Sequence, residues 1–457
     1  MNALVLSHIA RWTESRLLGA DVQINSVSTD TRSLQPGGLF IALKGEHFDG
    51  HDFVEQAQAV GASALLVSQP VTSNLPQVLC ADTQEALGEI AAAVQKQRRT
   101  VLLSLTGSNG KTTVKTLLHN ILSLTGSCYA NPGNFNNEIG LPLAVLQAPD
   151  DAQFGIYEMG AGKPGDIAYL CSIVQPTVAL VNNIAPAHIE RMHSLFGIAE
   201  TKGAIYEALC DDGIGIVNAD DAFAAYFMQR IGSRRSLRFG IDNDADVWAS
   251  KIQQQVESVS FCLHIPGAQA DITLQIPGRH SVLNALAASA MALAAGASID
   301  HIGDGLRSAK AVSGRLKIHK LVNGGILIDD AYNANPGSVA AAISTLSQNN
   351  INAWLVLGDM AELGPDAESL HKQIGTFALV SGINKLLTVG TLSKTASKAF
   401  GKNAIHFSNQ AELIQYLKAE INADVHCLIK GSRSSAMDRV VKALLSDSNT
   451  MENNCVA

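Results

Sequence analysis

The sequence predicts three consecutive α/β domains, and three observations support this prediction. The chain has 457 residues, which at roughly 150 residues per domain corresponds to about three domains. Short apolar runs alternate with helical patterns along most of the chain, as in parallel sheets covered by helices. A buried strand near residue 101 leads into a glycine-rich turn and an amphipathic helix. We expect a small N-terminal α/β module (1–82), a central parallel-sheet domain (83–312) and a C-terminal Rossmann-like α/β domain (313–457).

The N-terminal module is predicted from short alternating elements. Strand-like runs occur at Gly38–Leu43 and Ala64–Val67, with a helical stretch from Phe53 to Val60 between them. A second helical stretch, 84–98, leads into the apolar run Val101–Leu105, which we interpret as a buried strand.

The central domain continues with strands at Val178–Val181 and Gly215–Val217 and a helix at Ala199–Leu209. Residues 244–276 alternate apolar and polar side chains, which predicts antiparallel strands at a sheet edge. The alanine-rich stretch Ser281–Ala297 is shorter than the roughly 20 residues of a membrane span, so we expect a buried helix. Four further apolar runs predict a second α/β sheet: Ile326–Ile328, Trp354–Leu357, Lys385–Val389 and Cys427–Ile429.

Composition excludes several classes of protein. The net charge is −8 and the pI about 5.9, which argues against a nucleic-acid-binding surface. The N-terminus lacks a basic region and a cleavage signal, so no secretory signal is expected. The seven cysteines are scattered and form no CxxC pair, which fits reduced thiols in the cytoplasm better than a disulfide framework or a zinc site.

The strongest motif is Thr106-Gly-Ser-Asn-Gly-Lys-Thr-Thr113, which follows a strand and precedes an amphipathic helix. This is the context of a P-loop, although Leu105 stands where the longer GxxxxGK[ST] pattern has its first glycine. Backbone N–H groups of such a loop surround phosphate oxygens. Lys111 would neutralise the outer phosphates of a nucleotide and Thr112 would bind Mg²⁺. The alternative is an ordinary glycine-rich turn, but strand, loop, Lys-Thr pair and helix all occur in the required order.

Single polar residues at strand ends leave two interpretations open. Glu158 follows a predicted strand and is either a Mg²⁺ ligand or a solvated carboxylate. His188 follows Val178–Val181 and is either a residue of the crevice above the sheet or an ordinary loop residue. Lys202 lies on an apolar helix, where a single lysine is usually at the surface.

Two amide-rich segments also leave two interpretations each. The segment 131–142, NPGNFNNEIGLP, is either a loop that binds a polar substrate or a flexible turn-rich loop. The segment 329–336, DDAYNANP, offers carboxylates, an aromatic ring and amides for a ribose and adenine. It also has the pattern of a helix start, with Asn335 as N-cap and Pro336 at the first helical position.

Together these motifs resemble those of the Mur ligase family, ATP-dependent enzymes that form amide bonds in peptidoglycan precursor synthesis. The resemblance covers nearly the whole chain and implies that the central domain is an ATPase domain. It implies ATP contacts from the loop residues Gly107, Asn109, Gly110, Lys111, Thr112 and Thr113. The Asn-rich loop resembles that of the family and implies substrate contacts from Asn134, Asn136 and Asn137.

The resemblance also implies metal and catalytic residues. Thr112 and Glu158 correspond to ligands of one Mg²⁺ ion. His188 corresponds to the family histidine at a second Mg²⁺, and Lys202 to a carbamoylated lysine bound to that ion. A carbamate offers the hard anionic oxygens that Mg²⁺ prefers, which a lysine does not. The implied catalytic residues are Lys111, His188 and Lys202.

Further nucleotide contacts are implied near the C-terminal domain. Asn284 ends the stretch 278–284, GRHSVLN, which resembles an adenine-contacting stretch of the family, with Ser281 where the family usually has Asn. Arg315 corresponds to an arginine that reaches the nucleotide phosphates. In DDAYNANP the implied contacts come from Asp330, Tyr332, Asn333 and Asn335.

The resemblance also suggests the substrates. DDAYNANP, LGDMAELG (357–364) and KGSR (430–433) are similar to the family branch that adds D-alanyl-D-alanine. Near the N-terminus, Ser28, Thr29, Asp30, Thr31, Arg32 and Lys44 belong to stretches that resemble a uridine-nucleotide-binding module. The implied partners are UDP-N-acetylmuramoyl-tripeptide and D-alanyl-D-alanine, with ATP, Mg²⁺ and a carbamoylated Lys202. The implied setting is a cytoplasmic monomer without nucleic acid or membrane.

Two other functions are compatible with parts of this sequence. The first is a related amide ligase, such as the diaminopimelate- or lysine-adding member or folylpolyglutamate synthase, against which DDAYNANP argues. The second is a nucleotide-switch protein that hydrolyses a nucleotide without any amine acceptor. Dependence of phosphate release on an added amine would separate the second from the ligases.

Overall fold

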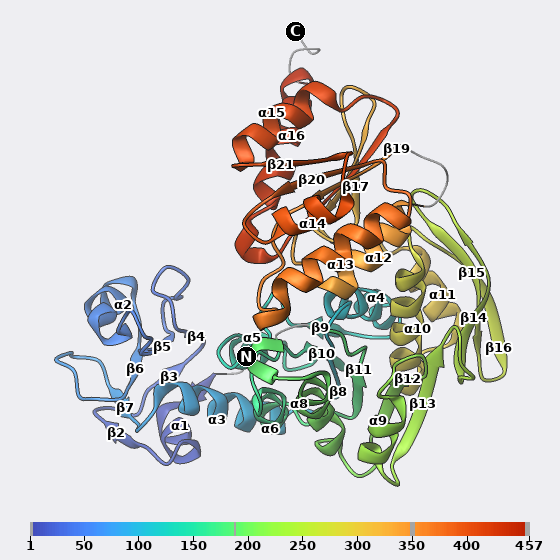
Figure 1. Ribbon diagram of the computed structural model, residues 1–457. Coiled ribbons are helices and arrows are strands. Elements are labelled where there is room, and N and C mark those ends of the chain that lie inside the picture. The colour runs from blue at the N-terminus through green and yellow to red at the C-terminus, as the bar shows by residue number, and fades with distance from the viewer. Residues whose placement is uncertain (1–2, 187–188, 348–351, 453–457) are drawn as a thin grey trace.

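A computed structural model describes residues 3–186, 189–347 and 352–452. The described residues form three sheet-based units that follow one another along the chain (Figure 1). The N-terminal module, in blue, stands beside the central domain, in green and yellow. The C-terminal domain, in orange and red, lies over the central domain. The three-domain α/β class predicted from the sequence is confirmed.

The N-terminal module is built on a five-stranded sheet with the order β2-β7-β6-β5-β4. Its strands are β2 (Arg16–Leu18), β4 (Val27–Ser28), β5 (Leu39–Ile41), β6 (Ala64–Val67) and β7 (Gln77–Leu79), and a separate antiparallel pair is formed by β1 (Leu4–Val5) and β3 (Gln23–Ile24). Its helices are α1 (Leu6–Trp12), the 3-10 turn η1 (Gly50–Phe53) and α2 (Val54–Val60). The helix expected from Phe53 therefore begins as a 3-10 turn.

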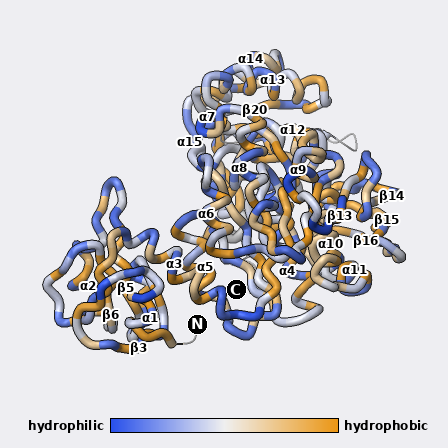
Figure 2. The backbone as a smooth tube through the Cα atoms, turned by 90° about the horizontal axis from the view of Figure 1, so that it is seen from below, coloured by the Kyte–Doolittle hydropathy of each residue, from blue (hydrophilic) through white to orange (hydrophobic). Residues whose placement is uncertain are grey.

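Helix α3 (Thr83–Lys96) joins the module to the central domain. Asp82 caps it, because its carboxylate accepts the N–H groups of Gln84 and Glu85. Its buried face, which includes Leu87 and Ile90, belongs to a core that continues from the module into the central domain. Figure 2 shows α3 between the two units. The predicted boundary at residues 82 and 83 thus falls at the start of a helix that packs on both sides.

The central sheet has nine strands in the order β16-β15-β14-β13-β12-β11-β8-β10-β9. The strands are β8 (Val101–Thr106), β9 (Cys128–Ala130), β10 (Phe154–Glu158), β11 (Val178–Val181), β12 (Ile214–Asn218), β13 (Arg235–Gly240), β14 (Val247–Gln254), β15 (Val259–Ile265) and β16 (Ala268–Leu274). The pairs from β9 to β14 are parallel, whereas β14-β15 and β15-β16 are antiparallel. The antiparallel edge predicted for 244–276 is confirmed.

Helices cover both faces of this sheet. One face packs against α5 (Gly140–Gln147), α6 (Asp166–Ile173), α8 (Leu195–Glu207) and α9 (Ala224–Ile231), and the other against α4 (Lys111–Leu122), α10 (Arg279–Ala294) and α11 (Ile299–Arg307). The short α7 (Ile189–Met192) precedes α8. Helix α10 is buried on nearly all sides, as its alanine-rich sequence predicts.

The C-terminal sheet has six strands in the order β17-β18-β22-β19-β20-β21. They are β17 (Lys317–Lys320), β18 (Ile326–Asp330), β19 (Asn352–Leu357), β20 (Lys385–Val389), β21 (Ala404–Phe407) and β22 (Val425–Lys430), all parallel except β17. Its helical elements are α12 (Pro336–Leu346), η2 (Gly364–Asp366), α13 (Ala367–Val380), α14 (Ser393–Phe400), α15 (Gln410–Glu420), η3 (Arg433–Ser435) and α16 (Asp438–Glu452). Apolar clusters on both faces of the sheet complete the core.

The strand order of the central sheet changes direction at β8. Strand β8 lies between β10 and β11, and the chain leaves β8 toward α4. In open parallel sheets, ligands bind beyond the carboxyl ends of strands at such a point. None of the helices in the described parts of the chain is long and apolar enough to cross a membrane.

Candidate functional site

The glycine-rich loop lies at the crevice between β8 and α4. Gly110 has φ +80°, a conformation that glycine adopts without strain. A Cβ atom there would lie 2.3 Å from Oδ1 of Asn284 and 2.6 Å from Nδ2 of Asn182. The loop therefore needs glycine both for its backbone shape and for the close approach of two side-chain amides.

Two asparagines that directly follow β11 hold this loop in place. Asn183 Oδ1 accepts the backbone N–H of Asn109 at 2.9 Å, and Asn182 Nδ2 donates to the carbonyl of Asn109 at 2.9 Å. Asn182 Nδ2 also donates to Asn284 Oδ1 at 3.0 Å, and Asn218 Nδ2 donates to the carbonyl of Asn182. Amides suit this position because each one both donates and accepts.

Lys111, Thr112 and Glu158 meet beside the loop. Lys111 Nζ donates to the carbonyl of Gly107 at 2.7 Å, and Thr112 Oγ1 donates to Glu158 Oε2 at 2.8 Å. Burial lowers the pKa of Lys111 by more than the nearby Glu158 carboxylate raises it. The carboxylate of Glu158 thus faces the helix that carries the two P-loop residues.

Glu158 is buried, with 3% of its surface exposed, so it is not the solvated strand-end residue that the sequence left possible. Burial alone would raise the pKa of Glu158. The charges of Lys115 and Lys111 and the hydrogen bonds from Thr112 and Asn136 outweigh burial and hold the pKa below its usual value. The residue is therefore a carboxylate at neutral pH.

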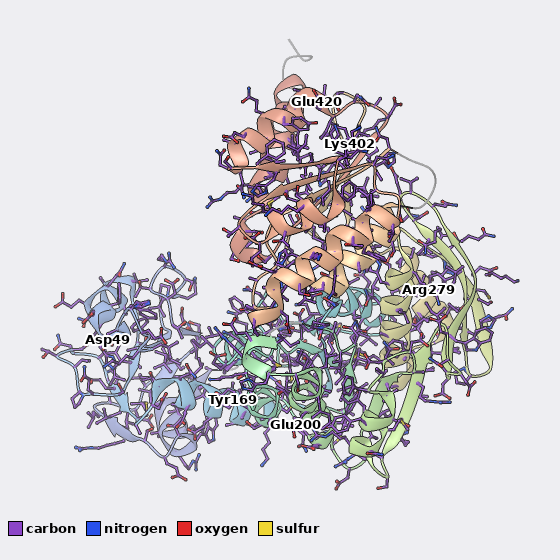
Figure 3. All side chains as sticks on the ribbon, in the orientation of Figure 1. Asp49, Tyr169, Glu200, Arg279, Lys402 and Glu420 are labelled. Carbon is purple, nitrogen blue, oxygen red and sulfur yellow. The ribbon has the colours of Figure 1, made fainter. Side chains whose placement is uncertain are left out.

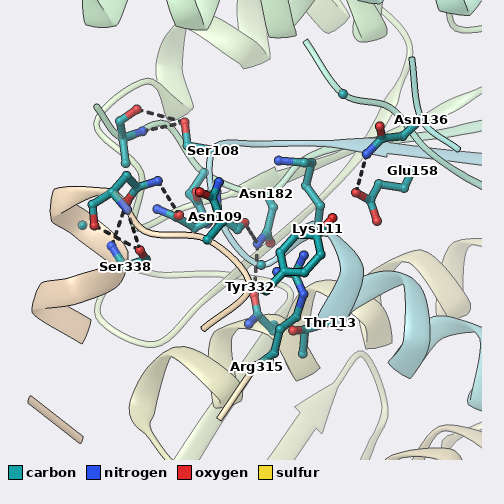
Figure 4. A pocket seen from close by; sticks show the side chains of 18 of the residues that line it. Ser108, Asn109, Lys111, Thr113, Asn136, Glu158, Asn182, Arg315, Tyr332 and Ser338 are labelled. Carbon is teal, nitrogen blue, oxygen red and sulfur yellow. Dashed lines mark hydrogen bonds between the residues drawn. The ribbon is translucent and has the colours of Figure 1, made fainter. Parts of the chain in front are cut away.

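The Asn-rich loop, residues Asn131–Pro142, is attached to the end of β10. Asn136 Nδ2 donates to Glu158 Oε1 at 2.9 Å (Figure 4). Asn131 Nδ2 donates to the carbonyl of Glu158 at 3.0 Å, and Asn131 Oδ1 accepts the N–H of Glu158 at 2.9 Å. Asn137 Oδ1 accepts the N–H of Gly140 at the start of α5. Asn134 lines the cavity described below.

The C-terminal domain contributes residues directly to the P-loop. Arg315 Nη2 donates to Thr112 Oγ1 at 2.9 Å, and its guanidinium lies 4.5 Å from the ring centre of Tyr332. Asn335 Nδ2 donates to Asn109 Oδ1 at 2.8 Å. The two hydrogen bonds join positions more than 200 residues apart, so the site is complete only when both domains are present.

The segment DDAYNANP also lines the site, next to these contacts with the P-loop. Lys430 Nζ is hydrogen-bonded to Asp330 Oδ2 and, at 3.0 Å, to the carbonyl of Asn333. His280 faces this pair, and its burial lowers its pKa. Asn335 also caps α12, with Pro336 as the first helical residue, so both interpretations of this segment are compatible.

A cavity of about 700 Å³ connects these features. This volume lies within the range of roughly 300–1,000 Å³ found for ligand sites. Its wall contains many of the residues singled out from the sequence: Asn109, Gly110, Lys111, Thr113, Asn134, Asn136, Asn137, Glu158, Asn284, Arg315, Asp330, Tyr332, Asn333 and Asn335. Figure 4 shows Lys111, Tyr332 and Arg315 among the side chains that line it.

Comparison with known proteins identifies the family. Three family descriptions match consecutive parts of the chain: "Mur ligase family, catalytic domain" over 23–99, "Mur ligase middle domain" over 105–292, and "Mur ligase, glutamate ligase domain" over 314–433. The chain belongs to the Mur ligase family.

Individual relatives extend over nearly the whole chain. The UDP-N-acetylmuramoyl-tripeptide–D-alanyl-D-alanine ligase of Escherichia coli K12 is 43% identical over 97% of this chain and 99% of its own length. A crystal structure of MurF from Acinetobacter baumannii is 33% identical, with a TM-score of 0.93 and coverage of 98% and 99%. MurF of Thermotoga maritima, crystallised with ADP, is 26% identical, with a TM-score of 0.85 and coverage of 93% and 98%.

Lys202 of this Mur ligase is a buried residue, not a surface one. It lies in the middle of α8 and only 1% of its surface is exposed. Burial lowers the pKa of Lys202 well below its usual range; the charge of Lys111 acts in the same direction and Asp166 opposes it. His188, the other residue expected at a second metal ion, lies outside the described residues.

The residues expected to bind a uridine nucleotide lie on the N-terminal module and away from the cavity wall. Figure 3 labels Asp49 on this module and Tyr169 on the side of the central domain next to it. Lys44 is exposed, with its Nζ 3.9 Å from Asp49 Oδ2. Asp30 and Arg32 form an ion pair, and this contact lowers the pKa of Asp30 to about 2.

The neighbouring hydroxyl residues of that stretch are partly buried. Ser28 and Thr31 are both buried. Ser28 Oγ accepts the N–H of Asp30. Thr29 lies between them at intermediate exposure. The segment is therefore a hydrogen-bonded turn, and its role in substrate binding stays a prediction.

The sequence interpretation missed two residues of the Mur ligase site. Lys115 follows Lys111 by one turn, on a helix that the sequence predicts to be amphipathic, and only 5% of its surface is exposed. Asn131 fastens the Asn-rich loop through both ends of its amide. A lysine among the apolar positions of α4 was the available signal for the first, whereas nothing in the pattern separates Asn131 from the other asparagines of its loop.

Proposed function

We propose that the chain uses ATP to join D-alanyl-D-alanine to UDP-N-acetylmuramoyl-tripeptide, with release of ADP and phosphate, in peptidoglycan precursor synthesis. The observation that carries the proposal is the similarity over nearly the full length to a ligase of that name. The cavity supports it, because a P-loop and the start of the C-terminal domain share one wall. The enzyme is an ADP-forming ligase of an acid and an amino acid.

The proposed reaction has two steps. A carboxylate oxygen of the tripeptide attacks the γ-phosphorus of ATP, the bond to the ADP oxygen breaks, and an acyl phosphate forms. The amine of D-alanyl-D-alanine then attacks the acyl carbon, a proton leaves the nitrogen, and the carbon–oxygen bond to phosphate breaks. Because negative charge gathers in both steps, positioning and electrostatic stabilisation are expected to dominate. Lys111 and Arg315, two of the cationic side chains that line the cavity, are proposed to supply this stabilisation.

The residues present fit a Mg²⁺ ion. Thr112 Oγ1 and the Glu158 carboxylate are hard oxygen ligands that already lie in contact. Mg²⁺ in nucleotide sites uses one or two such protein ligands together with water and phosphate oxygens. Within the described ranges, no group of three or more His, Cys, Asp or Glu side chains is arranged so that it could hold a metal ion. When bound, the ion would supply positive charge to the phosphates.

Lys202 is proposed to be carbamoylated. Its burial favours the neutral amine, which is the form that adds to carbon dioxide. The resulting carbamate would offer two anionic oxygens to a second Mg²⁺ together with His188. Labelling with ¹³C-bicarbonate tests this: a carbamate carbon resonance is expected, and its equal intensity in a Lys202→Met variant would contradict the assignment.

The remaining roles are divided among the domains. The N-terminal module, with Ser28, Arg32 and Lys44, is proposed to bind the uridine diphosphate end of the acceptor. Asn284 and the segment Asp330–Asn335 are proposed to bind the nucleoside of ATP, and Asn134, Asn136 and Asn137 the acceptor near its reacting end. The protein is proposed to act as a cytoplasmic monomer.

The test of the proposed function is phosphate release from ATP and Mg²⁺ with each substrate omitted in turn. Release is expected only when both UDP-N-acetylmuramoyl-tripeptide and D-alanyl-D-alanine are present. Release with a different amine would preserve the ligase mechanism and change the substrate. Release that needs neither partner would favour the nucleotide-switch alternative and contradict the proposal.

A further inference from the structure

Lys115 occupies an unusual place in the site. It lies on α4 one turn beyond Lys111, and its Nζ reaches the beginning of the Asn-rich loop. Nζ donates to the carbonyl oxygens of Asn131 at 2.8 Å and Gly133 at 3.1 Å, and it lies 3.4 Å from Glu158 Oε2. The side chains of Lys115 and Glu158 are only 7% and 4% exposed.

These contacts account for a charged residue at a buried helix position. An ammonium group has three N–H donors and no acceptor, and here three oxygens surround it. A buried charge is costly unless it is both paired and hydrogen-bonded, and Lys115 meets both conditions. The cost of burying it is thus offset only while the loop carbonyls and Glu158 stay where they are.

The Asn-rich loop depends on such side-chain contacts for its shape. Residues 131–139 form neither helix nor strand. The loop is held at its beginning by Lys115 and by the amide of Asn131, and further along by Asn136, whose carbonyl accepts the N–H of Gly160 at 2.7 Å. Lys115 is the link among these that also joins the loop to the P-loop helix.

We propose that Lys115 is a positioning residue that fixes the Asn-rich loop to the P-loop helix and to Glu158, and so places the loop amides for the acceptor substrate. It touches neither substrate nor reacting atoms itself. This inference rests on the proposed function, because it assumes that Asn134, Asn136 and Asn137, which line the cavity, face the tripeptide end of the acceptor.

A lysine with a purely structural role would behave differently. Its loss would lower the fraction of folded enzyme and reduce the rate with all substrates alike, with unchanged KM values. Loss of a positioning residue would act mainly on the substrate that the loop receives. The two roles are therefore separated by comparing the kinetic constants for the acceptor with those for the dipeptide.

The experiment compares Lys115→Met with a control, Lys96→Met, which removes one exposed charge at the end of α3. For Lys115→Met, kcat/KM for UDP-N-acetylmuramoyl-tripeptide is expected to fall about 10- to 100-fold, as for other outer partners of a metal-site ligand. KM for D-alanyl-D-alanine, and the Kd for ADP without added metal, are expected to stay within about twofold, because neither ligand is assigned to the loop. The control Lys96→Met is expected to have the same kcat/KM, KM and Kd values as the unaltered chain.

Hydrogen exchange gives a readout that does not depend on activity. Amides of residues 131–137 are expected to exchange faster in Lys115→Met, while those of α4 and β10 keep their protection. Unchanged exchange rates in the loop, or equal losses of kcat/KM for the tripeptide substrate and for the dipeptide, would overturn the proposal.

A second variant covers the case in which Lys115→Met does not fold. Lys115→Gln keeps two N–H donors and removes the charge. The same fall in kcat/KM for UDP-N-acetylmuramoyl-tripeptide is expected, without a change in KM for D-alanyl-D-alanine. If the unaltered chain releases phosphate only with both substrates while Lys115→Gln has unchanged constants for the tripeptide, this inference fails and the proposed function stands. If the unaltered chain needs neither substrate, the proposed function fails and the inference fails with it.

Discussion

Asn335 both caps a helix of the C-terminal domain and contacts the P-loop, and two substitutions separate the two contributions. Asn335 Oδ1 accepts the N–H of Ser338 at 2.9 Å and so caps α12. Asn335 Nδ2 donates to Asn109 Oδ1 in the P-loop at 2.8 Å. Asn335→Ala removes both interactions. Asn335→Ser keeps a capping oxygen, but its hydroxyl is too short to replace the amide that reaches Asn109.

The expected magnitudes follow from these contacts. Loss of an N-cap costs about 1 kcal/mol, whereas serine caps about as well as asparagine. In a domain of this size, about 1 kcal/mol corresponds to a fall of roughly 2–4 °C in the unfolding midpoint. Loss of the hydrogen bond to the P-loop costs about 0.5–1.5 kcal/mol, or about a 2- to 12-fold loss in kcat/KM for ATP. Only Asn335→Ala should show the lower unfolding midpoint, whereas both variants should show the lower kcat/KM for ATP.

The sequence offers a convenient assay for the thermal effect, because each domain contains one tryptophan: Trp12, Trp248 and Trp354. In a background with Trp12→Phe and Trp248→Phe, the fluorescence of Trp354 reports unfolding of the C-terminal domain alone. Equal midpoints for the Ser and Ala variants would refute the capping argument. An unchanged kcat/KM for ATP in Asn335→Ser would refute the argument that this bond joins the domains in the active state.

Three further predictions concern the loop, the metal site and pH. Gly110→Ala would place a Cβ 2.3 Å from Asn284 Oδ1 at a positive φ, so calorimetry should show ADP affinity at least about tenfold weaker; unchanged affinity would contradict the assignment of this loop. Glu158→Gln should lower the rate of phosphate release by at least the roughly 10- to 100-fold seen for partners of metal ligands, and a normal rate at every Mg²⁺ concentration would exclude Glu158 as a ligand. His371 is buried, accepts the N–H of Met360, and has its pKa lowered chiefly by burial. The imidazole of His371 thus binds a proton less readily in the folded state than in the unfolded state. Its contribution to the free energy of unfolding is therefore complete above a pH of about 6.5, and it is lost as the pH drops below that value, by up to about 1.4 kcal/mol per pH unit. Urea unfolding at two pH values should show a weaker fall in His371→Gln, and an equal fall would contradict this explanation.

The parts of the fold that the sequence predicted are those with local signals. The strand β8, the glycine-rich turn and α4 follow one another within 22 residues, and each signal lies inside its own element. The edge strands β14 to β16 were predicted from alternation, and the start of α12 from the pair Asn335 and Pro336. The order of strands in each sheet was not predicted, because it depends on which distant segments pair.

In the candidate site, too, residues in a contiguous motif could be predicted, whereas features that depend on distant segments could not. Lys111 and Thr112 were identified because their motif is contiguous. The burial of Glu158 could not be read from the sequence, because it results from Lys115, Thr112 and Asn136, which approach it from 22 to 46 residues away. The burial of Lys202, likewise, reflects the packing of α8 on the central sheet.

The measurement that tests the central claim most directly follows ¹⁸O from the acceptor carboxylate of UDP-N-acetylmuramoyl-tripeptide during turnover with ATP and D-alanyl-D-alanine. The proposed mechanism predicts a product heavier than the acceptor by the dipeptide less one water, and one carboxylate oxygen transferred to each phosphate released. A product of that mass with unlabelled phosphate would contradict the acyl phosphate. Phosphate release without any such product would contradict the ligase function itself.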